Sequence, residues 1–235
     1  MKQIPQSSTI LALDTCTEGC SVALLYKGQI LSEFAEVPRE HSQRLLPMVD
    51  NILKQANIKL VDLDVIAYGR GPGSFTGIRI CTSMTQGLAL GADLPVVGIS
   101  TLATMAQKAI NEGAKQVFAS IDARMGEVYS GQFIAENGLA CLVGKEHVSA
   151  PENIELNLDT SHTIVCCGTG FEAYPHLLEI AGDMTLLSNA RLPQAENMLL
   201  LAQREIALGN ATSVDELVPV YLRDKVTWKK LPGRE

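Results

Sequence analysis

The sequence predicts an α/β protein with two lobes, each built on a mixed sheet flanked by helices. Strand triplets are followed by helices, and this succession occurs twice along the 235 residues. In addition, an apolar strand, an aspartate, a polar turn, a second apolar strand and a glycine-containing hairpin follow one another at 9–28 and again at 116–138. Hairpins are common, but the aspartate holds the same place in both turns, so we favour an internal duplication over coincidence.

The first half of the chain is clearly patterned. Three extended stretches separated by turns predict a β-meander at Thr9–Leu13, Cys20–Tyr26 and Gln29–Val37. Helical spacing and continuous apolar runs then predict, in order, a helix at His41–Ala56, a strand at Val61–Ala67, a helix at Ile78–Gly91, a strand at Leu94–Ile99 and a helix at Thr101–Asn111.

The second half repeats this order less clearly. We expect strands at Gln116–Ile121, Glu127–Ile134 and Thr163–Cys167, and helices at Phe171–Ile180 and Ala195–Leu208. We place the first lobe at 1–105 and the second at 106–235, with the tail 219–235 packing back on the first lobe. Two α/β lobes with mixed sheets are typical of the actin/hexokinase-like (ASKHA) class, in which the aspartate-bearing hairpin of each lobe faces a nucleotide in the cleft.

Composition limits the function further. The chain is 46% hydrophobic and 19% charged, so a large core is expected, and its formal net charge of −7 argues against free-standing nucleic-acid binding. The N-terminal residues are polar and no apolar run approaches the roughly 18 residues that span a bilayer, so we expect a cytoplasmic protein with no membrane segment. The six cysteines form no CxxC pair, so we expect reduced thiols.

The two aspartate turns are candidates for phosphate chemistry. After the first strand, the amides and hydroxyls of Thr15 and Thr17 could hold phosphate, and the carboxylate of Asp14 could hold Mg²⁺ through water. Asp122 occupies the matching place in the second half. The alternative, a polar hairpin turn with a capping aspartate, stays open.

A glycine-rich segment, GRGPGSFTGIR at 69–79, is the most distinctive stretch. It lacks the lysine of a P-loop and the glycine spacing of a dinucleotide fingerprint. Gly71 and Gly73 indicate positive φ angles or a close backbone approach. Two interpretations remain: a tight strand–helix connection, or an anion or nucleotide site at a helix N-terminus assisted by Arg79.

Other motifs are weaker. Gly168 and Gly170 resemble the glycine turn that abuts adenosine in the ASKHA class, although an ordinary turn explains them as well. The four histidines have no zinc-ligand spacing, and the Gly-x-Ser-x-Gly motif of serine hydrolases is absent from the sequence.

With these motifs the chain resembles the TsaB family, also called YeaZ. The resemblance rests on LALDTCTEGCSVAL, HSQRLLP, GRGPGSFTGIR, GLAL, SIDARMGEVY and PVYLRDKVTWKK, and covers nearly the whole chain. It implies an accessory protein of the actin-like class. Such a protein would join the catalytic paralogue TsaD and the ATPase TsaE in making N6-threonylcarbamoyladenosine (t6A) at adenosine 37 of tRNAs that read ANN codons.

The resemblance also implies partners and a surface. It implies a heterodimer with TsaD, a homodimer when TsaD is absent, and contact with tRNA only within the complex. No intrinsic cofactor is expected, although ATP or ADP with Mg²⁺ at the partner interface stays open. The expected interface uses the helices at 41–56 and 78–91, with His41 at the surface, and comprises His41, Leu45, Val49, Ile80, Met84 and Leu88.

One departure from TsaD bears on catalysis. TsaD-like chains carry a His-x-x-x-His metal site at positions that are Thr101 and Met105 here, and neither side chain replaces an imidazole ligand. We therefore predict neither a metal site nor catalytic residues. The alternative is an active kinase or nucleotide hydrolase that uses Asp14 and Asp122, whereas no residue set for a protease can be assembled. The role of the basic tail, in partner contact or as a solvated end, is open for Arg223, Lys225, Trp228, Lys229 and Lys230.

Overall fold

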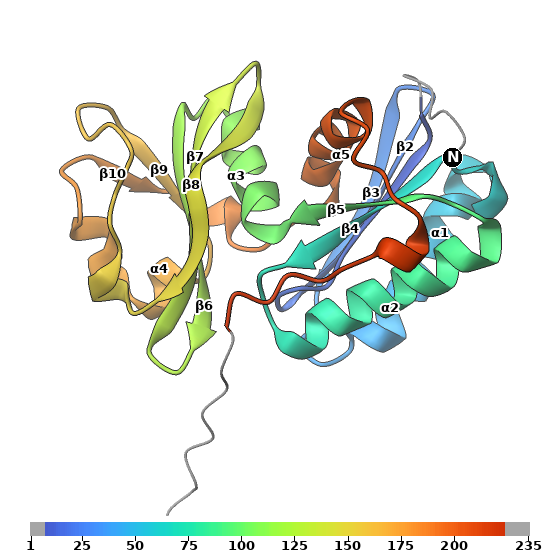
Figure 1. Ribbon diagram of the computed structural model, residues 1–235, viewed down its shortest axis with the longest axis horizontal. Helices are drawn as coiled ribbons and strands as arrows, with labels where there is room; N and C mark the ends of the chain where they lie inside the picture. The colour runs from blue at the N-terminus through green and yellow to red at the C-terminus, as the bar shows by residue number, and fades with distance from the viewer. Residues whose placement is uncertain (1–7, 224–235) are drawn as a thin grey trace, which may run out of the picture.

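The computed structural model describes residues 8–223, which form two lobes, each on a five-stranded mixed sheet (Figure 1). The first sheet has the order β3-β2-β1-β4-β5, with β1 at Ile10–Asp14, β2 at Gly19–Tyr26, β3 at Gln29–Glu36, β4 at Val65–Gly71 and β5 at Val96–Ser100. The second has the order β10-β9-β6-β7-β8, with β6 at Gln116–Arg124, β7 at Glu127–Glu136, β8 at Leu139–Ser149, β9 at Ile164–Cys167 and β10 at Met184–Leu186.

The two sheets have the same topology. In each, the first three strands form an antiparallel meander, and the fourth and fifth strands run parallel to the first. This repeat agrees with an internal duplication, and the fold is the two-lobed actin/hexokinase-like class that the sequence predicts.

Five α-helices cover the sheets. They are α1 at His41–Ala56, α2 at Phe75–Ala92, α3 at Thr101–Asn111, α4 at Gly170–Ala173 and α5 at Met198–Ala207. α1 and α2 pack on one face of the first sheet, and α3 contacts both sheets. Short 3₁₀ helices lie at Leu60–Asp62, Pro151–Asn153, Pro175–Glu179, Ser188–Ala190, Ala195–Asn197 and Val214–Glu216.

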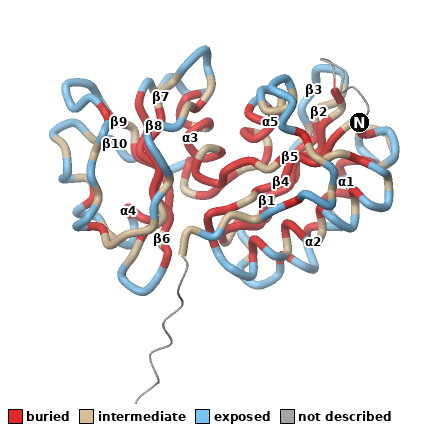
Figure 2. Tube along the Cα trace, in the orientation of Figure 1, coloured by how far each residue is buried: buried red, intermediate tan, exposed pale blue. Residues whose placement is uncertain are grey.

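Strand alternation in β1 divides the core of the first lobe. Leu11 and Leu13 face a cluster formed with α1 and α2, whereas Ile10 and Ala12 face a second cluster. This second cluster includes residues of α3, α5 and the second sheet, so it is shared by the two lobes. Figure 2 shows the buried positions concentrated along the central strands and around α3.

The end of the described chain returns to the first lobe. α5 packs on the first sheet, Thr212 forms an antiparallel bridge with Val96, and the Val220 amide donates to the Arg70 carbonyl at 2.7 Å (Figure 1). The predicted boundary at 105 therefore falls inside α3, and α5 covers the first sheet although it follows the strands of the second. Of the predicted tail, 224–235 lies outside the described residues.

One predicted helix is wrong. Residues 171–180 do not form a continuous helix, because α4 ends at Ala173 and a 3₁₀ helix begins at Pro175. Proline lacks the amide that a helix interior needs and disfavours helical backbone in the preceding residue, and Tyr174 has a φ of −136°. α2 begins earlier than expected, where the Ser74 hydroxyl accepts from the Gly77 amide.

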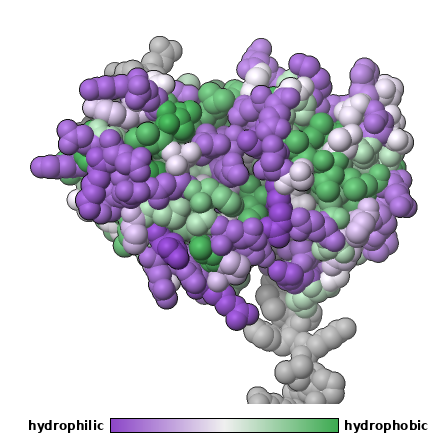
Figure 3. All heavy atoms as spheres, turned by 180° about the vertical axis from the view of Figure 1, so that it is seen from behind, coloured by the Kyte–Doolittle hydropathy of each residue, from purple (hydrophilic) through white to green (hydrophobic). Residues whose placement is uncertain are grey.

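The surface is mixed in character. Among residues 8–223, no helix is long and apolar enough to cross a bilayer. Figure 3 shows hydrophobic patches separated by hydrophilic side chains on the face opposite to the view of Figure 1. The six cysteines are free, and all except the half-buried Cys141 are buried.

The glycine segment packs directly on the turn that follows β1. A β-carbon at Gly69 would lie 2.0 Å from Asp14 Oδ2, and one at Gly73 would lie 2.1 Å from the Cys16 carbonyl oxygen. A β-carbon at Gly77 would lie 2.2 Å from the Thr15 carbonyl oxygen. These glycines therefore allow a close backbone approach, which is the structural one of the two interpretations considered above.

This contact buries Asp14 at the end of β1. The side chain has no solvent exposure, and its Oδ1 accepts from the Cys16 amide at 2.9 Å. Loss of solvation raises the pKa of Asp14 from 3.8 to about 7, against the smaller lowering effects of Cys16 and Thr101. The folded protein thus holds a proton on this carboxyl well above the pH at which the unfolded chain releases it.

We predict opposite effects for two glycine-to-alanine substitutions within α2. Gly77→Ala forces a β-carbon against the Thr15 carbonyl and should lower the free energy of unfolding by about 1–3 kcal/mol or more. Gly87→Ala, the matched control, points into open space and should raise it by up to about 1 kcal/mol through helix propensity. Urea unfolding measures both, and equal effects would contradict the close approach.

We predict that Asp14→Asn removes a pH dependence of stability. The raised pKa stabilises the wild type fully below 3.8, and this contribution is lost as the pH rises through about 7. Relative to the variant, the wild type should lose roughly 3–4 kcal/mol between about pH 4 and pH 8. Asparagine keeps the acceptor for the Cys16 amide. If the difference in unfolding free energy between the two proteins instead stays constant across this pH range, Asp14 is ionised in the folded protein.

Candidate functional site

A cavity of about 340 Å³ lies between the lobes. It is formed by the turn after β1, the start of α2, the β6–β7 turn and the C-terminal segment, which places residues of both lobes around one space. Of the predicted phosphate-site residues, three line this cavity: Thr17, Gly73 and Asp122.

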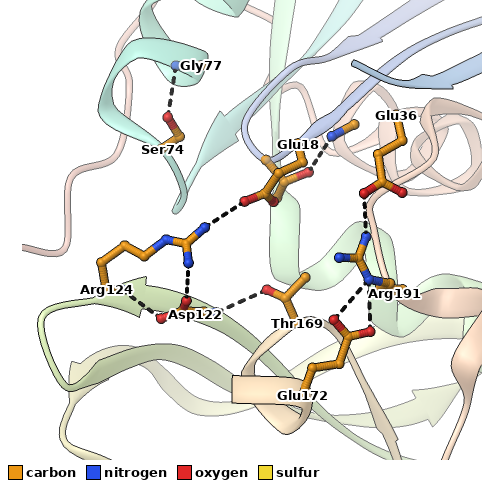
Figure 4. Close-up of polar contacts among 11 residues, drawn as sticks. Glu18, Glu36, Ser74, Gly77, Asp122, Arg124, Thr169, Glu172 and Arg191 are labelled. Atoms are coloured by element: carbon orange, nitrogen blue, oxygen red, sulfur yellow. Dashed lines mark hydrogen bonds and ion pairs between the residues drawn. The ribbon is translucent and has the colours of Figure 1, made fainter. Parts of the chain in front are cut away.

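An arginine connects the two lobes inside this cavity. Arg124 donates to Glu18 of the first lobe at 3.0 Å and pairs with Asp122 of its own lobe at 2.8 Å (Figure 4). Asp122 Oδ1 also accepts from the Arg124 amide at 2.8 Å. The carboxylate that the sequence offers for Mg²⁺ is therefore already neutralised by a guanidinium.

Two further arginines join distant segments. Arg191 binds Glu172 at 2.8 Å and Glu36 at 2.9 Å, which links α4 of the second lobe to β3 of the first (Figure 4). Arg223, at the end of the described chain, binds Glu127 at 2.5 Å. Arg223 also donates to two carbonyls of the β6–β7 turn, so it is not a solvated tail residue. Lys225, Trp228, Lys229 and Lys230 lie outside the described residues.

The other first-lobe residues of the predicted site lie behind the cavity wall. Asp14 and Thr15 are fully buried, and the Thr15 hydroxyl donates to the Gly77 carbonyl at 2.8 Å. Gly71 has a φ of +97°, and a β-carbon there would meet the Val220 carbonyl. Asp14 is therefore closed off from the cavity, whereas Asp122 lines it and is held in an ion pair with the exposed Arg124.

The glycine pair of the second lobe makes the equivalent contact. β-carbons at Gly168 and Gly170 would lie 2.1 Å from the carbonyl oxygen and the hydroxyl oxygen of Ser120, and Gly168 has a φ of +106°. Between them, the Thr169 hydroxyl accepts from the Asp122 amide at 3.1 Å (Figure 4). The pair is therefore a packing feature against β6, and neither glycine lines the cavity.

Arg79 stacks on an aromatic ring of its own segment. Its guanidinium lies over the Phe75 ring, 3.8 Å from the ring centre, on the outer side of α2. Phe75 in turn contacts Tyr221 of the C-terminal segment. Arg79 thus extends an aromatic surface at the edge of the cavity.

Half of the predicted partner-contact residues lie in the core. His41, Leu45 and Val49 are 7%, 0% and 3% exposed, and Leu45 and Val49 belong to the core cluster on the first sheet. Their assignment to a partner surface is wrong, as is the surface position expected for His41, because the apolar stripe of α1 covers its own sheet. The α2 residues of this prediction are half-buried: Ile80, Met84 and Leu88.

The positions that match the TsaD metal ligands lie inside the protein. Thr101 and Met105, in α3, are 0% and 1% exposed. Within 8–223, no group of three or more His, Cys, Asp or Glu side chains is arranged to hold a metal ion. A hydroxyl and a thioether also lack the donor strength of two imidazoles toward Fe or Zn.

The sequence interpretation missed the residues that connect the lobes. Arg124 and Glu18 each lie next to a predicted motif, and Arg124 follows Asp122 by two positions. The sequence did contain one signal for this contact: Glu18 and Arg124, which have opposite charges, stand in the matching turns of the two halves. Their pairing depends on how the two lobes meet, which no local pattern contains.

Comparisons with known proteins identify a family model and relatives that match most of this chain. A family model described as "TsaD: tRNA N6-adenosine threonylcarbamoyltransferase" matches residues 30–230. The tRNA threonylcarbamoyladenosine biosynthesis protein TsaB of Escherichia coli is 48% identical over 229 residues, covering 96% of this chain and 99% of the relative. The TsaB protein of Haemophilus influenzae is 45% identical and covers 98% of this chain and 100% of the relative.

Two solved structures superpose closely on this chain. YeaZ from Pseudomonas aeruginosa superposes with a TM-score of 0.85 at 43% identity, covering 92% of this chain and all of that one. A crystal structure of a protein with similarity to peptidase YEAZ, also from Pseudomonas aeruginosa, gives 0.86 at 44% identity with the same coverage. The chain therefore belongs to the TsaB family, also called YeaZ, within the wider group that the TsaD model matches.

Proposed function

We propose that this protein is a non-catalytic partner subunit in t6A biosynthesis on tRNAs that read ANN codons. In this role it binds TsaD and stabilises its active form, and TsaE joins the assembly. tRNA is bound only within the complex, in the cytoplasm. Membership of the TsaB family supports the pathway, and the closed aspartate turns support the accessory role.

The observation that carries the accessory role is the state of the two aspartates. Gly69 packs against the buried carboxyl of Asp14, and Arg124 forms an ion pair with Asp122. A kinase or nucleotide hydrolase of this class needs carboxylates that reach Mg²⁺ in the cleft. This geometry argues against the alternative enzyme. A nucleotide with Mg²⁺ at the TsaD interface stays a proposal, and the partner would have to supply its metal ligands.

The outer side of α2 is the best candidate for the TsaD contact. Phe75 and Leu90, two large apolar side chains of this helix, are 54% and 64% exposed and available to a partner. Gly87 and Gly91 lie on the same helix with open space beside them, so a partner helix can approach closely. Leu46 adds an exposed apolar residue from α1. A homodimer in the absence of TsaD would use the same surface.

We predict that Gly87→Arg weakens TsaD binding without unfolding the protein. The new side chain extends into open space, so it leaves the monomer intact but prevents close helix packing. Isothermal titration with TsaD should show at least about a tenfold loss of affinity, since 1.4 kcal/mol corresponds to that factor. Size-exclusion chromatography should show the homodimer lost in parallel.

Gly182→Arg is the matched control. Gly182 lies in the second lobe and also has open space beside it. The control should bind TsaD with wild-type affinity. Equal affinities of the Gly87 and Gly182 variants would remove α2 from the interface.

Reconstitution tests the accessory role itself. At fixed TsaD and TsaE, t6A formation should depend on this chain, remain with Asp14→Asn, and fall with Gly87→Arg. The isolated chain should show no nucleotide turnover. Loss of t6A formation with a folded Asp14→Asn protein, together with turnover by the isolated wild type, would instead establish the enzyme.

A further inference from the structure

A second cavity, of about 450 Å³, opens between the lobes and has no part in the function proposed above. It lies where β4 and β5 end, between α5 and the β7–β8 hairpin. The ends of parallel strands are a common place for ligands in α/β proteins, and the volume suits a small molecule. Its charged lining residues are Arg70, Glu136, Glu146, Arg204 and Glu205.

Arg70 carries an unpaired charge in this cavity. It is half-buried, and within 8–223 its guanidinium makes no hydrogen bond or ion pair with another side chain. Its Nε is fully buried without a hydrogen-bond partner. A guanidinium has five N–H donors, and the one on the buried Nε of Arg70 costs free energy while it stays unsatisfied. Arg70 therefore keeps donors that no side chain within 8–223 accepts, and a ligand carboxylate could accept from them.

Glu146 supplies the opposite charge. Its Oε1 accepts a hydrogen bond from the hydroxyl of Ser100, which orients the carboxyl group at the cavity wall. Burial raises the pKa of Glu146, while Ser100 and the charge of Arg70 lower it. Glu146 and Arg70 attract one another but form no ion pair, so both charges face the cavity without direct contact.

The mixture of charges selects the ligand class. A simple anion would be attracted by Arg70 but repelled by Glu146, and a simple cation would meet the reverse. Arg204 and Glu205 of α5 repeat the same mixture at the cavity wall. A molecule that carries a carboxylate and an ammonium group a few bonds apart satisfies both sides.

We propose that this cavity binds a small zwitterion of the α-amino acid class, with its carboxylate on Arg70 and its ammonium group on Glu146. The carboxylate completes the donors of Arg70 with charge-assisted hydrogen bonds. The ammonium group pairs with Glu146, whose orientation Ser100 already holds. The side chain of the ligand would extend toward Phe133 and Leu201, which also line the cavity.

The test uses the full-length protein and the twenty common L-α-amino acids, each added singly at millimolar concentration. Thermal unfolding should show at least one that raises the melting temperature, because a ligand that binds only the folded state stabilises it. Titration calorimetry of that amino acid is then compared with its N-acetyl and its amide derivatives. Each derivative lacks one of the two charges, and both should bind at least about tenfold more weakly.

Variants test the two contacts. Arg70→Gln and Glu146→Gln should each lose binding, while Lys145→Gln, an exposed neighbour outside the cavity, should keep it. Circular dichroism checks that each variant is folded. Binding of no amino acid, equal binding of the N-acetyl derivative, or binding that survives in both folded cavity variants would each overturn the proposal. The derivative comparison on the wild type decides the question even if a variant does not fold.

Discussion

The contact between the glycine segment and the turn after β1 brings peptide groups so close that any β-carbon would collide. Gly69, Gly73 and Gly77 make this approach, and Asp14 loses its solvent as a result. The second lobe repeats the device where Gly168 and Gly170 meet Ser120. Both aspartate turns are thereby supported from behind by glycine backbone, and the character of the cleft follows from this packing.

A cleft supported in this way differs from that of a working nucleotide enzyme. Its polar groups are used to hold the lobes together: Arg124 joins Glu18 to Asp122, and Arg191 joins Glu36 to Glu172. Domain closure over a substrate needs lobes that can separate, and here each of the two arginines contacts a carboxylate in both lobes. On the outside of the first lobe, α2 contributes two exposed large apolar side chains, Phe75 and Leu90.

Much of the fold could be predicted from sequence, because amphipathic periodicity is local. The bounds of α1 and α3 agree with their predicted ranges, and the meander does so within a residue or two. β8 and β10 were missed because their pairing depends on neighbours distant in sequence. For the site, the sequence indicated which residue types were present, but it did not indicate where their side chains point. Leu45 shows the difficulty: an apolar stripe is visible in the sequence, whereas the element that covers it is not.

The placement of α5 on the first sheet has a consequence for biogenesis. The inner face of that sheet is complete only when α5, which is made after the strands of both sheets, docks on it. Until then the nascent first lobe presents an uncovered aliphatic surface to solvent, which is the kind of surface that chaperones bind. The long sequence separation of these contacts also slows folding. The two halves of the chain therefore share one sheet topology, but they cannot fold independently of each other, because α5 of the second half completes the first lobe.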